Sequence, residues 1–463
     1  MNAKMNKMEF LDRITEQKIF KKIIQSANDE FVIVYGRRRV GKSALLKHVT
    51  NTRGIYHLAD LNDKRMQIQQ LANTIATKIP DFDAVIYPSW YALLIALNAR
   101  LSKKITLVID EFPYLINTSA ELPSEMQKLL DLKKLDKLTL ILCGSSQQMM
   151  RDLFLGITAP LYGRTTFNFN VKEMKVGWLQ QYLKCSAEQA IMEFATWGGI
   201  PRYWEVRKKY KTLEQAQLQA IMNKDGLLYE EPMRLFMDDM RSAVQAFSLV
   251  NLIGNGCHKL SEIATVLEKP ATNFSRPLAQ LIDMGYVRKE IPFGEKEENS
   301  KKSLYWLDDS FMNFYMQMVS PNKSIIELGL EKELKNKLAA KLPQLYSVVF
   351  EELVRESVNS YHYFGKKWGK AYRYWGKPDG KTETEMDLMC LSLDGKSILI
   401  GEVKWSDAID VKTVKKQLAA KIALFALDKQ LKVYTAVWVK NKGKVKNADT
   451  TTFDCHEVVK QAL

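Results

Sequence analysis

The chain has 463 residues, of which 46% are hydrophobic and 26% charged, and its formal net charge is +15. This length exceeds what one hydrophobic core supports, and the composition excludes a disordered chain. No stretch reaches the ~18 apolar residues of a membrane helix, and no apolar signal region opens the sequence, so we expect a cytoplasmic protein without membrane contact. The cysteines form no C-x-x-C pair, so we expect neither disulfides nor zinc.

The first expected elements are a helix over 8–27, with an imperfect apolar stripe, and an apolar strand over 31–35. The next residues fit G-x-x-x-x-G-K-[ST], in which backbone N–H groups cradle phosphates, the lysine reaches the β- and γ-phosphates and the hydroxyl ligates Mg²⁺. A helix follows, and its positive end favours the same anion. A structural glycine turn is the alternative. We predict a nucleotide site made by Gly36, Arg37, Arg38, Arg39, Val40, Gly41, Lys42, Ser43 and Ala44.

Further strands and helices continue the pattern. We expect a short strand over 54–59, helices over 64–79 and 89–103, and an apolar strand from 105 that ends in Asp110 and Glu111. An aspartate at such a strand end holds Mg²⁺ or its water in P-loop enzymes, and an adjacent glutamate orients the attacking water. A buried strand over 138–144 ends in two hydroxyls, and either can sense the γ-phosphate or cap the next helix. These are Ser145 and Ser146.

These motifs together resemble the prokaryotic archaeal-type ATPases of the AAA+/STAND group. Tyr162-Gly163-Arg164 and Gly198-Gly199-Ile200-Pro201-Arg202-Tyr203 follow in the order of that family. The resemblance implies ATP and Mg²⁺ as cofactors, a core over 1–171, a helical lid over 172–240 and then a winged helix. It makes Arg164 a candidate arginine finger or sensor for the γ-phosphate of its own or a neighbouring subunit. If Arg164 acts on a neighbouring subunit, the protein forms a homo-oligomer. The alternative for Arg164 is a surface pair with a carboxylate.

Residues 241–320 carry the pattern of the expected winged helix. Helices to about 253, over 261–267 and over 273–284 precede two strands, 287–291 and 303–307, that flank a charged hairpin tip over 294–302. Pro277 interrupts the third helix unless that helix begins near Ser275. Such domains read DNA with their last helix, but they also serve as rigid connectors.

The C-terminal part contains a predicted hairpin with a cluster of charges. Asp394-Gly395 lies between two apolar runs and favours a two-residue turn, which sets Asp387 opposite Glu402. Because side chains alternate along strands, Glu385 and Lys404 would share the face of these two. Like charges placed opposite one another destabilise a sheet unless something neutralises them, and a divalent cation would do so. A solvated face with a Glu385–Lys404 salt bridge is the alternative.

The Asp…Glu-x-Lys pattern resembles the PD-(D/E)xK nuclease family, with a helix before the hairpin and a helix and strand after it, over about 411–427 and 431–439. The resemblance implies a restriction-endonuclease-like domain over 321–463 that binds a second Mg²⁺ or Mn²⁺ through Glu351, Asp387 and Glu402, with Glu352 as a substitute for Glu351. Lys404 would assist the attacking water or the phosphate charge in phosphodiester hydrolysis. The positive net charge suits DNA as a partner.

We therefore expect an α/β multidomain chain, with a parallel-sheet P-loop ATPase core, a helical lid, a winged helix and a nuclease-like domain. Its predicted function is an ATP-hydrolysing switch that controls a metal-dependent DNA nuclease. The alternative is a signalling or scaffold ATPase whose C-terminal domain binds DNA or a protein partner without cleaving. Under either, Lys42 holds phosphate, Ser43 and Asp110 hold Mg²⁺, and Glu111 activates water.

Overall fold

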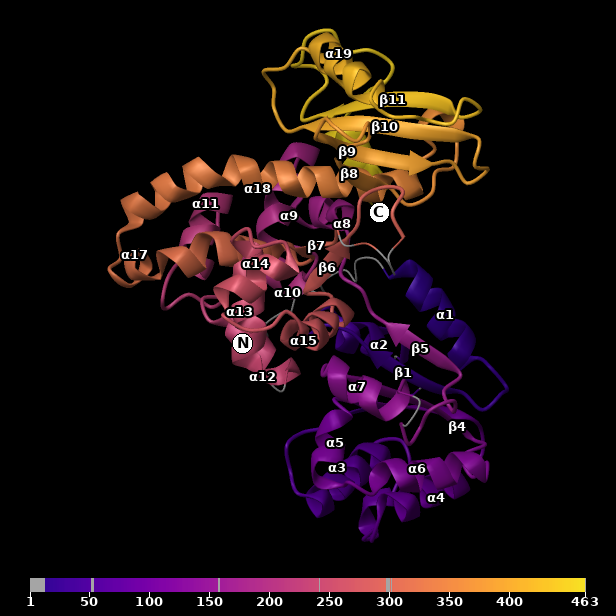
Figure 1. The fold of residues 1–463 in the computed structure, drawn as a ribbon. Helices are drawn as coiled ribbons and strands as arrows, with labels where there is room; N and C mark the ends of the chain where they lie inside the picture. Colours follow the sequence, from indigo (N-terminus) through magenta and orange to yellow (C-terminus); the bar gives the residue numbers. More distant parts are fainter. Residues whose placement is uncertain are drawn as a thin grey trace. The chain divides into compact units, whose positions relative to one another are not determined.

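The structure is a computed structural model that describes residues 13–50, 54–156, 159–240, 242–296, 300 and 302–462. The chain divides into two compact units, the first of Met1–Glu173 with Met237–Arg241 and the second of Met174–Phe236 with Ser242–Leu463 (Figure 1). The four-domain division stays a prediction. Residues 8–12 of the first expected helix, and 297–299 and 301 of the expected hairpin tip, lie outside the described residues. No helix in the described ranges has the length and apolarity that a membrane span requires.

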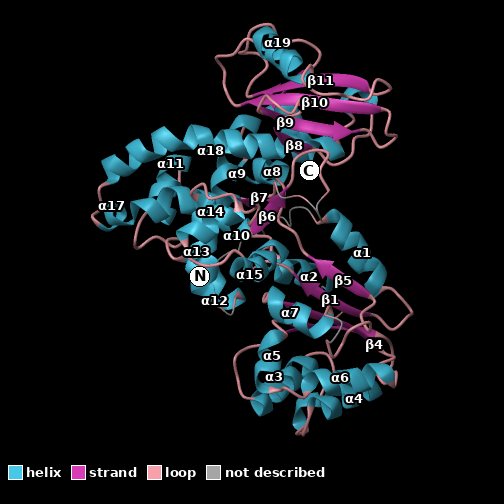
Figure 2. Ribbon diagram, in the orientation of Figure 1, coloured by secondary structure: helices cyan, strands magenta, loops and turns pink. Residues whose placement is uncertain are grey.

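The first unit is built on a parallel five-stranded sheet in the order β2-β3-β4-β1-β5. Its strands β1, β4 and β5 are labelled in Figure 2. β1 lies between β4 and β5, and all five of its residues are buried, which explains its uninterrupted apolar sequence. Strands of a parallel sheet end at one common edge, so the residues that follow β1, β3 and β4 lie along the same edge. The strands are β1 (Phe31–Tyr35), β2 (Ile55–Leu58), β3 (Ile105–Asp110), β4 (Leu138–Gly144) and β5 (Phe167–Asn170).

Helices cover both faces of this sheet (Figure 1). One hydrophobic core joins alternate residues of β1, β3 and β4 to α3, α4, α6 and α7, while α1 and α2 lie on the other side of the sheet. The helices expected over 64–79 and 89–103 are confirmed as α3 and α4. The helices are α1 (Ile14–Ile24), α2 (Lys42–Thr50), α3 (Lys64–Ala76), α4 (Trp90–Arg100), α5 (Pro113–Thr118), α6 (Leu122–Asp131) and α7 (Gln147–Phe154).

The second unit begins with helices and continues into a two-stranded hairpin. The three helices expected between 241 and 284 are confirmed as α13 (Ala243–Gly254), α14 (Leu260–Val266) and α15 (Thr272–Asp283). The last of these begins before Ser275 and continues through Pro277, so the proline does not interrupt it. The expected hairpin is confirmed as antiparallel β6 (Val287–Glu290) and β7 (Leu304–Leu307). The other helices here are α8 (Val176–Leu183), α9 (Ala187–Trp197), α10 (Pro201–Arg207), α11 (Leu213–Ala216), α12 (Glu231–Asp239), α16 (Ser310–Phe314) and α17 (Lys323–Glu327).

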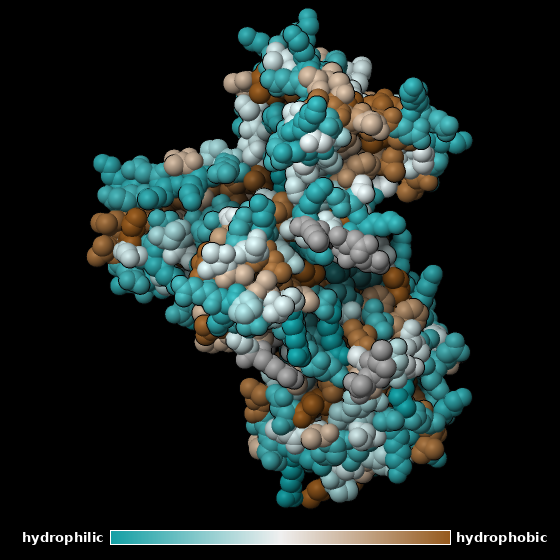
Figure 3. Space-filling view, in the orientation of Figure 1, coloured by the Kyte–Doolittle hydropathy of each residue, from teal (hydrophilic) through white to brown (hydrophobic). Residues whose placement is uncertain are grey.

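A helix of 30 residues, α18 (Glu331–Ser360), leads into the C-terminal sheet. Hydrophilic residues cover the side of α18 that faces the viewer in Figure 3, and its buried residues include Val349, Phe350 and Leu353. Because this helix contacts both α9 and β10 along its length, it connects the helical part of the second unit to the sheet.

The C-terminal sheet has the order β12-β11-β10-β9-β8. β9 and β10 are antiparallel, and their register pairs Ile398 with Leu391 and Gly401 with Leu388, as the Asp394-Gly395 turn predicts. β11 and β12 run parallel to β10. The elements are β8 (Tyr372–Gly376), β9 (Thr384–Leu391), β10 (Ser397–Lys404), α19 (Val411–Ile422), β11 (Lys432–Val439), β12 (Thr452–Asp454) and α20 (Cys455–Gln461).

One irregularity changes the faces of β9. Tyr372 pairs with Met389 and Tyr374 with Met386, so β8 advances two residues where β9 advances three. Such a bulge interrupts the alternation of side chains. Met386 and Met389 consequently share one hydrophobic cluster with Ile398, Ile400 and Leu418. We expected one face of the hairpin to carry Glu385, Asp387, Glu402 and Lys404. This prediction is wrong for Glu385, because its side chain is exposed, whereas Asp387 contacts Lys404.

Candidate functional site

The loop between β1 and α2 has the backbone that its glycines permit. Gly36 has a φ of +144° and Gly41 a φ of +101°, values that side chains with a Cβ rarely adopt. A Cβ on Gly36 would also lie 2.4 Å from the carbonyl oxygen of Val171, whereas one on Gly41 meets nothing within 4 Å. The chain thus turns sharply from the end of β1 into α2, which directs its first N–H groups toward the loop.

Lys42 is buried, with 4% of its surface exposed, at the first position of α2. Its Nζ donates to the carbonyl oxygens of Gly36, at 2.8 Å, and Arg37, at 2.9 Å. These bonds hold the ammonium group against the loop. A buried ammonium in a glycine-containing loop at the start of a helix is a suitable site for the phosphates of a nucleotide.

The other predicted loop residues have different surroundings. Arg37 is buried and forms an ion pair with Glu173. Arg38 is partly exposed and Arg39 exposed, the latter with a φ of +66°. Val40 is buried, and its carbonyl oxygen accepts a hydrogen bond of 3.0 Å from Arg13. Ala44 is exposed on α2. The three arginines therefore differ in how far they are exposed.

Asp110 ends β3 as a fully buried carboxylate. Its Oδ1 accepts a bond of 3.0 Å from the Glu111 N–H, and its Oδ2 accepts one of 2.5 Å from the hydroxyl of Tyr56. The same phenol has a side-chain hydrogen bond with Ser43, and burial and Asp110 raise the pKa of Tyr56 well above its ordinary value. Ser43 and Asp110 thus both face the Tyr56 hydroxyl. Their hydroxyl and carboxylate oxygens are the ligands that Mg²⁺ prefers, so this pair fits the ion.

Glu111 follows with a φ of +55°, unusual for a residue with a side chain. Its Oε1 accepts a bond of 2.7 Å from the Ser145 hydroxyl at the end of β4. Ser146 instead caps α7, where its Oγ accepts from the Met149 N–H. The two serines therefore have different roles, because Ser145 touches the predicted catalytic glutamate and Ser146 stabilises a helix end.

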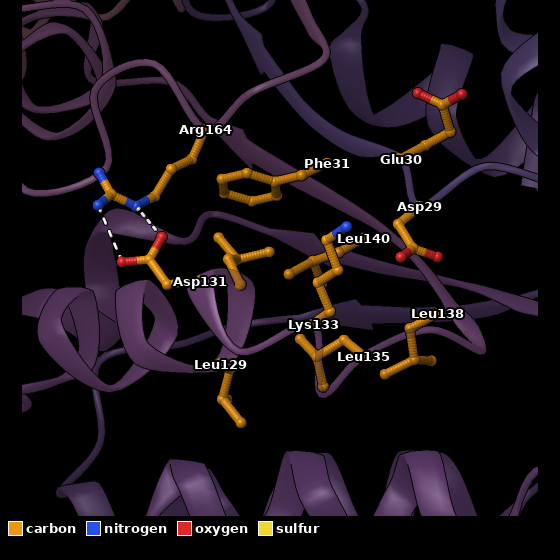
Figure 4. A pocket seen from close by; sticks show the side chains of 11 residues that line it. Asp29, Glu30, Phe31, Leu129, Asp131, Lys133, Leu135, Leu138, Leu140 and Arg164 are labelled. Atoms are coloured by element: carbon orange, nitrogen blue, oxygen red, sulfur yellow. Dashed lines mark hydrogen bonds and ion pairs between the residues drawn. The ribbon is translucent and has the colours of Figure 1, made fainter.

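Arg164 lies elsewhere. It donates to Asp131 through Nε, at 2.8 Å, and through its second nitrogen, at 3.0 Å, which lowers the pKa of Asp131. The pair borders a cavity of about 250 Å³ that Phe31 and Leu138, the first residues of β1 and β4, also line (Figure 4). This is the amino end of the sheet, whereas the phosphate loop follows the carboxyl end. The structure does not bring Arg164 to its own chain's phosphate site, because the sheet separates them.

The C-terminal cluster joins two lysines to two carboxylates. Lys404 Nζ lies 2.8 Å from Glu402 Oε2 and 3.3 Å from Asp387 Oδ2, and Lys421 Nζ of α19 lies 2.5 Å from Glu402 Oε1. Burial raises the pKa of Asp387, but Lys404 and the Val403 N–H outweigh it and hold that pKa below its ordinary value. Burial and then the charge on Asp387 raise the pKa of Glu402. The ammonium groups neutralise the carboxylates, as a cation was expected to do.

Glu351 of α18 belongs to the same cluster. Burial and then the charge of Asp387 raise its pKa to about 7. Glu352, the predicted substitute, is bound elsewhere, since its Oε1 lies 2.5 Å from Arg288 of β6. Among the described residues no group of three or more His, Cys, Asp and Glu side chains is arranged to hold a metal ion. The predicted ligands of the second metal therefore lie near one another, but lysine side chains already neutralise their negative charge.

Two residues of these sites escaped the sequence analysis. Tyr56 lies on β2, 54 residues before Asp110 in the chain, and Lys421 follows Glu402 by 19 residues. Neither belongs to a motif. β2 reads Ile-Tyr-His-Leu, with a buried histidine and an exposed leucine, and this short sequence does not indicate which partner the Tyr56 side chain meets.

The fold and the first site together define the class of protein. A parallel sheet with a phosphate loop after β1, a buried lysine and an acidic pair at the end of β3 is the core of a P-loop ATPase. Residues 10–203 match the family described as an ATPase domain predominantly from Archaea. The chain is therefore an enzyme that binds and hydrolyses ATP. Residues 315–422 match a second family, described as archaeal and bacterial proteins of unknown function.

Full-length similarity extends this result. The chain is 30% identical over 459 residues to an uncharacterized protein of Methanocaldococcus jannaschii, which covers 97% of this chain and 99% of that protein. The chain belongs to the family of that protein.

Two solved structures resemble the chain. The Walker-type ATPase of Pyrococcus abyssi has 20% identity and a TM-score of 0.53, with 68% of this chain and 98% of that chain covered. The ORC2 protein of Aeropyrum pernix has 14% identity and a TM-score of 0.45, with 73% and 97% covered. The first likeness supports the ATPase fold alone, and the second is too distant to support more.

Proposed function

We propose that this ATPase is a switch that controls a DNA phosphodiesterase in its C-terminal domain. In this proposal the ATPase core precedes a helical lid, a winged helix and a restriction-endonuclease-like domain. The observation that carries it is the contact of Lys404 with Asp387 and Glu402, from β9 and β10, together with Glu351 of α18, which lies near enough for the charge of Asp387 to act on it. These are the residue types that metal-dependent phosphodiester hydrolysis uses.

The cluster fits a divalent cation in part. Asp387 and Glu402 offer oxygen ligands of the right chemistry, and Glu351 feels the charge of Asp387, which indicates proximity. However, each oxygen of Glu402 already contacts an ammonium group. A bound Mg²⁺ or Mn²⁺ would supply charge stabilisation to the scissile phosphate, with Lys421 displaced from Glu402. Lys404 would then lie beside the phosphate.

The predicted winged helix acts in this proposal as a connector. Arg288 of β6 contacts Glu352 of α18, and Glu290 lies 3.9 Å from Arg355 and 3.7 Å from Arg373. The backbone N–H of Phe293, directly after β6, also donates to the Arg373 carbonyl oxygen, at 2.8 Å. A hairpin held in this way is engaged by the C-terminal part of its own chain, which supports the connector role over DNA reading.

A second candidate function has an observation in its favour. Because Lys404 and Lys421 already neutralise the carboxylates, the cluster is stable without metal. The chain would then be a STAND-type signalling or scaffold ATPase whose C-terminal domain binds DNA or a protein partner without cleavage. Action of Arg164 on a neighbouring subunit in a homo-oligomer is compatible with both candidates.

The two candidates differ in one assay. Purified full chain is incubated with circular, linear and single-stranded DNA, with Mg²⁺ or Mn²⁺, and with or without ATP. Glu402→Ala is compared with Glu385→Ala, which removes the same charge from an exposed position outside the cluster. The first candidate predicts metal-dependent cleavage that Glu402→Ala loses and Glu385→Ala keeps. If DNA cleavage depends on ATP and Lys42→Ala removes this dependence, the ATPase core controls the nuclease.

Absence of cleavage with hydrolysis of ATP intact would reject the nuclease. DNA binding, measured by fluorescence anisotropy at several salt concentrations, then separates the two forms of the second candidate. Steep salt dependence indicates contacts with the phosphate backbone. No binding at low salt indicates a protein partner.

A further inference from the structure

A tyrosine outside every motif lies within the ATP site. Tyr56 is on β2, next to β3, and its hydroxyl donates to Asp110 Oδ2 at 2.5 Å. Lys47 of α2 lies over the ring, with its Nζ 4.9 Å from the ring centre. The ring is therefore held by α2 and the hydroxyl by β3, and the phenol lies beside both residues that fit Mg²⁺.

Three polar groups surround the Asp110 carboxylate, namely the Glu111 N–H, the Tyr56 phenol and the buried Cys143 thiol. Its Oδ1 is occupied by the Glu111 N–H and its Oδ2 by the phenol, and none of its surface is exposed. A buried ionised carboxylate requires such partners, because water cannot reach it. Without the phenol, the carboxylate would keep the Glu111 N–H and the buried Cys143 thiol beside it, but its Oδ2 would lose the one partner that also bonds Ser43.

We propose that Tyr56 is a positioning residue for the Mg²⁺ of bound ATP. It acts through Asp110, whose carboxylate it holds toward the Ser43 hydroxyl at the start of α2. Outer hydrogen-bond partners of metal ligands set the orientation of those ligands, and their loss typically lowers metal affinity by about 10- to 100-fold. This inference concerns the ATP site and does not depend on the nuclease proposal.

The test is Tyr56→Phe in the full chain, which keeps the ring and its contact with Lys47. The affinity for ATP is measured by calorimetry in EDTA and in Mg²⁺. We expect Tyr56→Phe to bind ATP in EDTA with the wild-type affinity. The increase in ATP affinity that Mg²⁺ produces should be about 10-fold smaller in the variant than in the wild type. The Mg²⁺ concentration for half-maximal hydrolysis should rise by a similar factor.

The matched control is Tyr87→Phe, which removes a buried phenol that donates to the Phe82 carbonyl oxygen at 2.9 Å, away from the site. It should leave both affinities unchanged. In an Asp110→Asn background, addition of Tyr56→Phe should have no further effect on the Mg²⁺-dependent gain.

Three results would overturn the proposal. If Tyr56→Phe binds Mg²⁺·ATP more tightly, the phenol competes with the ion. If affinity falls equally in EDTA and Mg²⁺, Tyr56 supports the loop as a whole and not the ion. If Tyr56→Phe and Tyr87→Phe behave alike, the phenol has no role beyond packing.

Discussion

The Ser145 hydroxyl lies 2.7 Å from Glu111 Oε1 and so joins the end of β4 to the end of β3 across the ATP site. Glu111 is positioned by this bond and by a left-handed backbone with a φ of +55°. A general base must be held within reach of the water that it activates. Because Glu111 is the predicted base, we expect the serine to orient it for that role.

The first prediction concerns this pair. Glu111→Gln should lower the rate of ATP hydrolysis by about 100-fold or more with ATP binding retained, because proton transfer is lost. Ser145→Ala should lower the rate by about 10-fold, since one orienting bond of ~1–2 kcal/mol is removed. Single-turnover hydrolysis measures both, and Ser146→Ala is the control. Equal effects of the two serine variants would contradict the assignment.

The second prediction compares two glycines of the phosphate loop. Gly36→Ala adds a Cβ 2.4 Å from the Val171 oxygen, whereas Gly41→Ala meets nothing within 4 Å. Both variants strain a positive φ, at a cost of about 1–3 kcal/mol. Gly36→Ala should lower the free energy of unfolding by about 1–3 kcal/mol more, because of the added overlap. Urea denaturation is the measurement, and equal destabilisation would contradict the close approach.

The third prediction concerns pH. His57 is buried on β2 with its Nδ1 2.9 Å from the Thr74 hydroxyl, and burial lowers its pKa to about 4. Because the folded pKa lies below the unfolded value of 6.5, the unfolded chain binds the proton first as pH falls. Stability from neutral His57 is thus present above pH 6.5 and is lost as pH falls toward 4, by up to about 3 kcal/mol.

Urea denaturation of the wild-type chain and His57→Asn at several pH values checks this. Asparagine can keep the bond to Thr74 and does not titrate. The difference in unfolding free energy between the two chains should therefore shrink from pH 7 to pH 4. A constant difference would show that the pKa of His57 is the same in the folded and unfolded chains and would contradict the prediction.

The fourth prediction concerns the contact between the hairpin and α18. Arg288 and Glu352, 2.5 Å apart, are mostly shielded from solvent. Removal of Arg288 takes from Glu352 its ion-pair partner, whereas removal of Glu352 leaves Arg288 paired with Glu290 and Asp308. Arg288→Met should cost about 3–5 kcal/mol in unfolding free energy, Glu352→Gln should cost less, and the double variant should cost less than the sum of the two. The exposed Glu331–Lys335 pair of the same helix is the control. Lys335→Met should cost under about 1 kcal/mol, and similar costs at both sites would refute the buried role.

Much of the fold follows from local pattern. The apolar β1 sequence, the glycines after it and the Asp394-Gly395 turn each act over a few neighbouring residues, so the sequence predicts them. The register of β9 and β10 follows from the turn because the pairing of a hairpin is set at its closed end. The bulge in β9 was not predicted, since it depends on how β8 packs beside it.

The partners in the sites depended on tertiary structure. The sequence determined that Asp110, Glu111, Asp387 and Glu402 end or line strands, because strand patterns place residues on an edge or a face. Only the fold decided that Tyr56 meets Asp110, that Lys421 meets Glu402 and that Arg164 meets Asp131. The physical reason is that strand order and helix packing bring distant segments together, and no periodicity in the chain records which segments become neighbours.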